Sequence, residues 1–265
     1  CKTKHTEYFY SIEEGLNVLP EVVKAVESLD TTTIRASVPM YLCLKKLKHD
    51  YPSTKVILSG EGADELLQGY LAFNEMKTVE DAENWSLNLL QNIHRFDVQR
   101  SHFCCSSLGM EVRVPFLDAT FVNYCRSLPT EQLIPIFNQE KYQLRQALQQ
   151  YVPALLPEEI INRQKEQLSD GVGYKWIDTL RKASWYTRNR SNKDLMKHLP
   201  PHQVKDGLPV GGNEQLNIFD IFYSHFGETV FESTSKTLRT WVPGAGETYD
   251  ASGRCSKSHK YSSIL

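Results

Sequence analysis

The chain has 265 residues and a formal net charge of −2, so it lacks the marked basic excess of nucleic-acid-binding domains. With 40% hydrophobic and 23% charged residues, it has the composition of an ordinary globular protein that forms one large domain, or a domain with an extension. No apolar run approaches the roughly 18 residues that a membrane-spanning helix requires. We therefore expect neither nucleic acid nor a membrane as a partner.

The first part of the chain predicts helices that flank a strand. Apolar residues at helical spacing predict one helix over 13–29 and a second over 38–48, with Pro39 in the first turn of the second. The residues Val56 to Leu58 predict a short buried strand, which glycines end before the next helix begins. This order is typical of one repeat of a parallel α/β sheet.

From about residue 80 onward the pattern becomes mostly helical. Helices are predicted over 81–108, 118–128, 141–151, 158–161 and 213–225. The expected organisation is a partial nucleotide-binding α/β portion over 1–80, a helical portion over 81–235 and a flexible C-terminal tail over 236–265.

The six cysteines show no metal-binding or disulfide pattern. None is spaced as Cys-x-x-Cys, and Cys104 and Cys105 are adjacent in the sequence. We expect reduced thiols that are mostly buried as small hydrophobes, with metal binding as the alternative. Reduced thiols are typical of a cytosolic protein.

The stretch from Lys55 to Glu65 is the first candidate for chemistry. It runs Lys-Val-Ile-Leu-Ser-Gly-Glu-Gly-Ala-Asp-Glu and predicts a strand, a glycine turn and a helix N-terminus. Glycines let a backbone approach a ligand closely, and a helix N-terminus offers N–H groups and partial positive charge. The acidic residues Glu61, Asp64 and Glu65 either bind Mg²⁺ or a reacting cation, or they complement the helix dipole.

Three further stretches accompany this turn. They are Asp30-Thr-Thr-Thr-Ile-Arg-Ala-Ser37, Val112-Arg-Val-Pro-Phe-Leu-Asp118 and Arg163-Gln-Lys-Glu-Gln-Leu-Ser-Asp-Gly-Val-Gly-Tyr174. In this order the four stretches resemble the synthetase domain of glutamine-dependent asparagine synthetases, from about Tyr8 to about Trp176.

The resemblance implies a reaction and a fold. ATP adenylates the side-chain carboxylate of aspartate, pyrophosphate leaves, and ammonia attacks the β-aspartyl-AMP to give asparagine and AMP. The implied fold class is α/β, the remainder of a parallel-sheet ATP-pyrophosphatase domain (adenine nucleotide alpha-hydrolase-like) followed by a mostly helical region.

The resemblance also implies roles for the residues of the glycine turn. Ser59 and Gly60 match the turn that contacts the AMP portion of ATP. Glu61 matches the carboxylate needed around formation of the intermediate, where it orients the amino group of aspartate or takes a proton from ammonia. Asp64 is the expected Mg²⁺ ligand, because such sites use one or two carboxylates together with phosphate oxygens.

Lys165 is the expected charge stabiliser at the α-phosphate, and the alternative is a solvated surface lysine. The glycine-containing segment Ser169 to Gly173 after it suits a loop that orders over the substrate. Asp97 and Arg100 are expected to pair with each other or to hold Lys165. An ordinary surface pair at this spacing is the alternative.

Thr32, Thr33 and Arg35 are expected to bind aspartate from a loop between two helices. The guanidinium of Arg35 offers a fork of donors that matches a carboxylate, and the threonine hydroxyls complete the pocket. The alternative is that the threonines cap a helix that starts near Ser37 and that Arg35 is solvated.

Two parts of the family's machinery do not occur in these residues. There is no Ser-Gly-Gly-x-Asp-Ser pyrophosphate loop, and no stretch resembles a glutaminase domain. We therefore expect a piece of a longer asparagine synthetase that is inactive alone and whose ammonia comes from glutamine through a domain absent here. The alternatives are a truncated homologue that binds or regulates, or an amide-forming enzyme like the β-lactam synthetases. A homodimer of the complete protein stays open.

Overall fold

The computed structural model describes residues 3–136, 139–153, 155–163, 165, 168, 176, 179–180, 195–201, 204–205, 208–209 and 212–236. These residues are mostly helical and contain one two-stranded parallel sheet and one short antiparallel pair of strands. The chain divides into two compact units. The first consists of Cys1–Tyr8, Thr54–Gln99 and Met110–Glu166, and the second of Phe9–Ser53, Arg100–Gly109 and Gln167–Leu265.

The first unit holds the parallel sheet and most of the short helices. Its strands are β1 (Val56–Leu58) and β2 (Glu111–Arg113), and its helices are α3 (Ala63–Leu66), α4 (Val79–Asn92), α6 (Ala119–Ser127), α7 (Thr130–Leu133), α8 (Tyr142–Tyr151) and α9 (Glu158–Ile161). Single 3₁₀ turns η1 (Leu71–Glu75), η2 (Ile93–Arg95) and η3 (Pro115–Leu117) connect some of them. The helices expected at 118–128, 141–151 and 158–161 are therefore confirmed, to within a residue or so at their ends.

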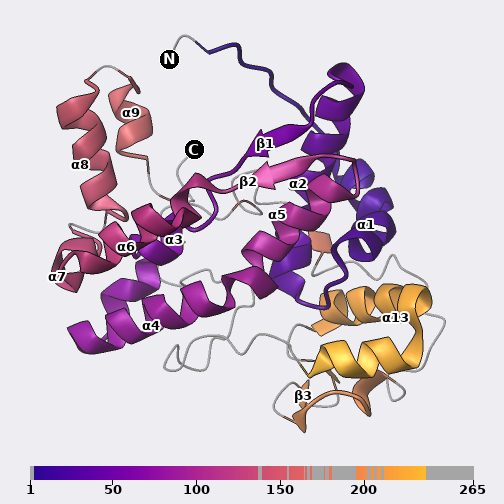
Figure 1. The fold of residues 1–265 in the computed structure, drawn as a ribbon. Helices are drawn as coiled ribbons and strands as arrows, with labels where there is room; N and C mark the ends of the chain where they lie inside the picture. The colour runs from indigo at the N-terminus through magenta and orange to yellow at the C-terminus, as the bar shows by residue number, and fades with distance from the viewer. Residues whose placement is uncertain are drawn as a thin grey trace. The chain divides into compact units, whose positions relative to one another are not determined.

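The parallel sheet confirms the expected strand but not its burial. β1 runs parallel to β2, with Ile57 opposite Val112 (Figure 1). Val56 and Leu58 are 40% and 71% exposed, so the expectation of a buried strand is wrong. Among the described residues, β2 alone pairs with β1, so these two strands form the whole of the parallel sheet.

The helix expected over 81–108 is interrupted. α4 ends at Asn92, η2 follows, and α5 (Asp97–Ser106) begins after Phe96. Phe96 has φ −130° and ψ −90°, which lies outside the helical region and breaks the ladder of backbone hydrogen bonds. One long helix was therefore the wrong prediction, and α5 begins in the first unit and continues into the second.

The second unit is built around long helices. Its elements are α1 (Ile12–Val26), α2 (Thr31–Asp50), the rest of α5, the strands β3 (Val204–Lys205) and β4 (Leu208–Pro209), and α13 (Gly212–Ser235). Ser11 begins α1 through a capping box with Glu14. The expected apolar stripe of α1 is confirmed, because Val22, Val23 and Val26 have no exposed surface.

α2 begins at Thr31, seven residues before the predicted start at Val38, because Asp30 caps it. Asp30 Oδ2 accepts hydrogen bonds from the Thr33 N–H (2.8 Å) and from Thr33 Oγ1 (2.7 Å). Pro39 therefore lies inside the helix, where it cannot donate to the carbonyl of Arg35. The indole Nε1 of Trp176 donates to that carbonyl instead, at 3.2 Å.

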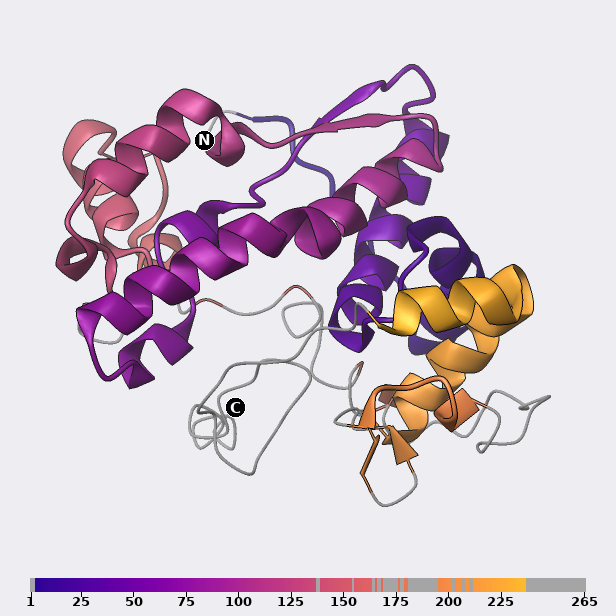
Figure 2. The ribbon, with the colours of Figure 1, turned by 60° about the horizontal axis from the view of Figure 1, so that its bottom comes forward.

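α13 confirms the helix expected at 213–225 and continues to Ser235 with a reversal at Gly227. Gly227 has φ 79° and ψ −179°, a conformation open almost only to glycine. The two helical segments fold back on one another (Figure 1 and Figure 2). Phe231 of the second segment packs edge-on against Phe219 of the first, with ring centroids 5.4 Å apart.

Two general expectations can be compared with the described residues. Cys104, Cys105 and Cys125 form no disulfide and are buried, as expected, whereas Cys43 also forms no disulfide but is exposed. Within the described part of the chain, no helix combines the length and the apolar character needed to cross a membrane.

Candidate active site

The glycine turn lies at the carboxyl end of β1, where ligands bind in parallel sheets. The Ser59 N–H donates to the Arg113 carbonyl at 2.9 Å and so extends the ladder by one residue. A Cβ added at Gly60 would meet no atom of the described residues within 4 Å, so these residues leave the space beside this backbone open. Gly62 has φ 93°, and a Cβ there would overlap Leu117, so the turn shape depends on glycine at this position.

Asp64 lies in the first turn of α3 and forms an ion pair with Lys141. Asp64 Oδ1 accepts from Lys141 Nζ at 2.6 Å, and the two side chains are 25% and 18% exposed. The described residues contain no group of three or more His, Cys, Asp or Glu that could hold a metal ion. A Mg²⁺ at Asp64 would therefore need phosphate oxygens as further ligands and would compete with Lys141. The assignment of Asp64 as a metal ligand stays a prediction.

Glu65 is the most strongly perturbed carboxyl of this turn. Its side chain is 4% exposed and accepts a hydrogen bond from the Tyr70 hydroxyl. Burial, followed by the nearby charges of Asp97 and Asp64, raises the pKa of Glu65 to about 7, against the opposing effect of the Tyr70 hydrogen bond. Burial and the same carboxyls hold the pKa of Tyr70 well above its ordinary value, so Tyr70 keeps its proton.

Lys165 lies in the same unit as the glycine turn. Its Nζ is 4.4 Å from the centroid of the Tyr70 ring, within the range of a cation–π interaction. Its backbone N–H donates to Glu140 Oε2 at 3.4 Å. Glu140 has no exposed surface, and Arg145 Nη2 lies 3.9 Å from its Oε2. The side chain of Lys165 is half-buried.

These contacts close into a ring, which we call the Lys165 ring. One half of this cycle of contacts leads from the Lys165 ammonium to the aromatic side chain of Tyr70, and from the Tyr70 hydroxyl to Glu65. The other half leads from Asp64, the neighbour of Glu65, through the ion pair to Lys141. Glu140, the neighbour of Lys141, then accepts the Lys165 N–H and closes the cycle. Sequence reasoning missed Tyr70, Glu140 and Lys141. The only sequence signal for them was the pair of opposite charges, Glu140 and Lys141, just before α8. Spacing could not predict the contact of Lys141, because its partner Asp64 lies far away in the sequence.

The residues expected to bind aspartate belong to the second unit. Thr32 and Thr33 lie in the first turn of α2, so the expectation that they lie in a loop is wrong, whereas their role in binding aspartate stays a prediction. Arg35 is 2% exposed, so the alternative of a solvated Arg35 is also wrong. Arg35 Nε and Nη2 donate to Glu214 Oε1 and Oε2, each at 2.5 Å. A substrate carboxylate would have to displace Glu214 to use the same two nitrogens.

The remaining predicted residues are placed as follows. Asp97 is the first residue of α5, and Arg100 lies one turn later and is 6% exposed. That Asp97 and Arg100 hold Lys165 stays a prediction, although the charge of Asp97 acts on Glu65 and Tyr70. The loop from Ser169 to Gly173 lies outside the described residues.

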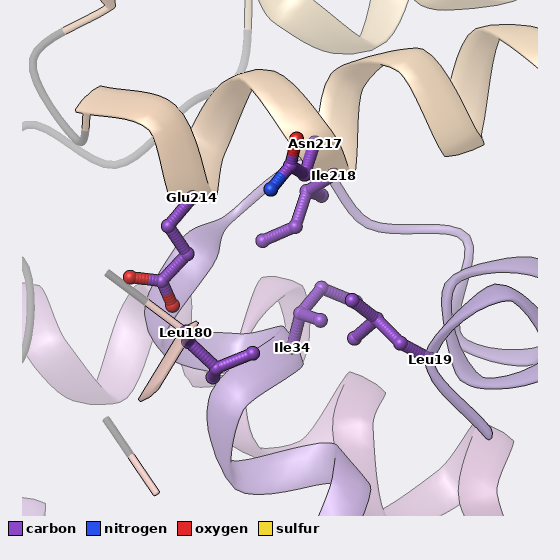
Figure 3. A pocket seen from close by; sticks show the side chains of 6 residues that line it. All are labelled: Leu19, Ile34, Leu180, Glu214, Asn217 and Ile218. Atoms are coloured by element: carbon purple, nitrogen blue, oxygen red, sulfur yellow. The ribbon is translucent and has the colours of Figure 1, made fainter. Parts of the chain in front are cut away.

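A small cavity of the second unit lies beside Glu214 (Figure 3). Its walls come from α1, α2, α13 and one further residue, and are formed by Leu19, Ile34, Leu180, Glu214, Asn217 and Ile218. The cavity has room for roughly a single water molecule. It is therefore too small for aspartate or a nucleotide.

Comparison with known proteins places the chain in a family. The sequence model of asparagine synthase matches residues 1–88 and 75–205, so the chain belongs to the asparagine synthase family. It is 34% identical over 267 residues to a probable glutamine-hydrolysing asparagine synthetase of Dictyostelium discoideum, which covers 97% of this chain and 46% of that relative. It is 34% identical over 265 residues to the glutamine-hydrolysing asparagine synthetase 1 of Arabidopsis thaliana, and the match covers 96% of this chain and 44% of that relative.

A glutamine-hydrolysing asparagine synthetase of Triphysaria versicolor is 39% identical over 267 residues, with 96% of this chain and 44% of the relative covered. The chain therefore spans less than half the length of these relatives. The resemblance drawn from the four sequence stretches is confirmed at the level of the family.

Proposed function

We propose that this chain carries the adenylating part of an asparagine synthetase. ATP activates the side-chain carboxylate of aspartate to β-aspartyl-AMP, and ammonia then displaces AMP to give asparagine. Membership of the asparagine synthase family supports this proposal. The corresponding fold is the remainder of a parallel-sheet, adenine nucleotide alpha-hydrolase-like domain followed by a helical region, and the parallel pair of β1 and β2 supports it.

The observation that carries the proposal is that Lys165 and the glycine turn, far apart in the sequence, belong to one compact unit and are linked by the Lys165 ring. Adenylation needs a backbone that admits the nucleotide and a cation near the α-phosphate. Ser59 and the open flank of Gly60 suit the first need. Lys165 suits the second need, the cation near the α-phosphate. Its ammonium contacts the Tyr70 ring, and no carboxylate of the described residues pairs with it.

In the first step, a carboxylate oxygen of aspartate attacks the α-phosphorus, and the bond from that phosphorus to the bridging oxygen breaks. Pyrophosphate leaves with the electron pair of that bond, and Lys165 stabilises the charge on the phosphoryl oxygens. Mg²⁺, when bound with ATP, neutralises phosphate charge, and Asp64 is the residue that would hold it.

In the second step, ammonia attacks the acyl carbon of this mixed anhydride, the bond from that carbon to the phosphate oxygen breaks, and AMP leaves with the electron pair of that bond. Glu61 accepts the proton that the nitrogen loses, or orients the amino group of aspartate. Thr32, Thr33 and Arg35 remain the proposed aspartate-binding residues, with Arg35 available once Glu214 is displaced. Asp97 and Arg100 support Lys165. The ammonia is proposed to come from glutamine through a glutaminase domain.

The test is aspartate-dependent release of pyrophosphate from ATP in the presence of ammonia. It compares this 265-residue chain with a longer form that includes a Ser-Gly-Gly-x-Asp-Ser loop. We expect turnover by the longer form alone. Folded proteins that both fail to release pyrophosphate would contradict the proposal, and release that requires a carboxylate substrate other than aspartate would replace it with another amide-forming reaction.

Two substitutions in the longer form test the assigned residues. Glu61→Ala should abolish aspartate-dependent release. Lys165→Ala should stop adenylation while ATP binding, measured by titration calorimetry, stays intact. Lys24→Ala, at an exposed lysine of α1, is the matched control and should leave both measurements unchanged. Normal turnover by Lys165→Ala would mean that Lys165 does not stabilise charge at the α-phosphate and is an ordinary surface lysine.

A further inference from the structure

We infer that Tyr70 is a positioning residue that holds the Lys165 ammonium against the face of its ring and so presents the ammonium to a phosphoryl group. The inference deepens the proposed function and rests on the role proposed there for Lys165. It begins from the 4.4 Å separation between Lys165 Nζ and the centroid of the Tyr70 ring.

Contact with a ring differs chemically from contact with a carboxylate. A carboxylate accepts hydrogen bonds from an ammonium and uses up its donors, whereas a ring face attracts the charge through its quadrupole. An ammonium on a ring therefore keeps N–H donors for an arriving anion. This is the state that a charge stabiliser at a phosphoryl group requires before its substrate binds.

The ring of Tyr70 is itself fixed in place. Its hydroxyl donates to the buried Glu65, and its ring stacks on Phe73 with centroids 6.4 Å apart and an angle of 17°. Trp85 contacts the same ring, with centroids 6.1 Å apart. Phe73 is 1% exposed, so this aromatic support is part of the core of the first unit. A ring held by its hydroxyl and by two aromatic neighbours can fix the position of a flexible lysine.

The backbone of Lys165 is held independently of its side chain. Glu140 accepts the Lys165 N–H, and the adjacent Lys141 pairs with Asp64 in the first turn of α3. The Lys165 ring thus restrains the residue at two points, and both restraints lead back to α3. The ammonium is positioned by Tyr70, and the backbone by Glu140.

The test measures the chemical reactivity of the Lys165 amine in this 265-residue chain. Trace labelling with acetic anhydride across pH 6–11, read by mass spectrometry, gives the rate at Lys165 relative to the exposed Lys24. Tyr70→Leu removes the ring that holds the Lys165 amine, so the labelling rate of this amine at neutral pH should rise by about threefold or more. Tyr70→Phe keeps the ring, so its Lys165 rate should not exceed that of the unmodified sequence.

Control variants separate positioning from general damage. Tyr124→Leu removes a tyrosine that is 59% exposed on α6 and should leave the Lys165 profile unchanged. Circular dichroism verifies that each variant is folded, and the Lys24 rate verifies the reagent. An unchanged Lys165 profile in folded Tyr70→Leu would overturn the inference. A rise of the same size in Tyr70→Phe would also overturn it, because the hydroxyl and not the ring would then control the amine.

A second measurement links the position of the ammonium to chemistry in the longer, active form. Tyr70→Leu should lower kcat for aspartate-dependent pyrophosphate release at least tenfold with little change in KM for ATP, and Tyr70→Phe should retain most of kcat. If the labelling of Lys165 responds as expected but no form of the protein releases pyrophosphate, the proposed function is wrong and the position of Lys165 is still established. A normal kcat in Tyr70→Leu would overturn the inference.

Discussion

Glu65 illustrates how burial sets the ionisation of one carboxyl in the first unit. Burial and the charges of Asp97 and Asp64 raise the pKa of Glu65 from its ordinary value of 4.5 to about 7. The folded protein therefore binds more protons than the unfolded protein between about pH 4.5 and pH 7. It follows that the free energy of unfolding falls as pH rises through this window, by roughly 1.4 kcal/mol for each unit of pKa shift.

Glu65→Gln should remove much of this fall. Its amide oxygen can still accept from the Tyr70 hydroxyl, but the side chain carries no titrating proton. Urea unfolding at pH 5, 6, 7 and 8, followed by circular dichroism, gives the free energy at each pH. We expect a flatter pH profile for Glu65→Gln, and an unchanged profile for Glu83→Gln at an exposed glutamate of α4. Parallel profiles for all three proteins would show that Glu65 ionises as an ordinary carboxyl.

The ion pair of Asp64 and Lys141 should contribute to stability because it is partly shielded from water. We expect a coupling energy of about 1 kcal/mol, above most exposed pairs and below fully buried ones. A double-mutant cycle of Asp64→Asn, Lys141→Met and the double variant, followed by urea unfolding, measures this coupling. Additive effects would mean that the pair contributes nothing measurable.

At the scale of elements, Arg35 and Glu214 join α2 to α13 within the second unit. Both side chains are 2% exposed, so removing one partner leaves a buried charge. Arg35→Met should lower the free energy of unfolding by roughly 3–5 kcal/mol, and Arg35→Met with Glu214→Leu should cost less than Arg35→Met alone. Urea denaturation measures both.

The exposed pair of Lys45 and Glu21, which joins α2 to α1, provides the control for this prediction. Their side chains are 49% and 48% exposed, and Lys45→Met should cost less than about 1 kcal/mol. Equal losses for Arg35→Met and Lys45→Met would mean that the buried pair is energetically an ordinary surface pair.

Local signals decided which elements could be predicted. Val56 to Leu58 form an apolar run between polar residues and glycines, so β1 could be predicted from the sequence. β2 has charged residues at both ends and is defined only by its pairing with β1. The start of α2 was misplaced because Pro39 indicated a first turn. The donor that replaces the missing N–H, Trp176, lies far along the chain and leaves no local trace.

Local sequence signals likewise predicted some residues of the candidate site but not the contacts that those residues make. The glycine turn could be found because its glycines are adjacent in sequence, and Gly62 needs its positive φ. Lys165 was proposed from its motif, but its contact with Tyr70 could not be derived from spacing. The engagement of Arg35 with Glu214 was equally hidden, because a buried arginine and a solvated one look alike in a sequence.

At the scale of the whole molecule, protection from solvent is uneven. Three residues of α2, Ile34, Val38 and Leu42, are at most 7% exposed, whereas α8 has no buried residue. Backbone amides of well-buried helices open less often. Native-state hydrogen exchange, followed by mass spectrometry or NMR, should therefore show much slower exchange in α2 than in α8. Similar protection factors in the two helices would contradict this prediction.

The two units are assembled from alternating stretches of chain, and this has a consequence during synthesis on the ribosome. α1 and α2 are made before α13, which packs against them, supplies Glu214 and follows more than 150 residues later. At ~5–20 residues per second the gap lasts roughly 8–30 s. Throughout that time the buried Arg35 and the apolar sides of α1 and α2 lack their final cover, so the nascent chain offers chaperones a binding surface that the finished protein conceals.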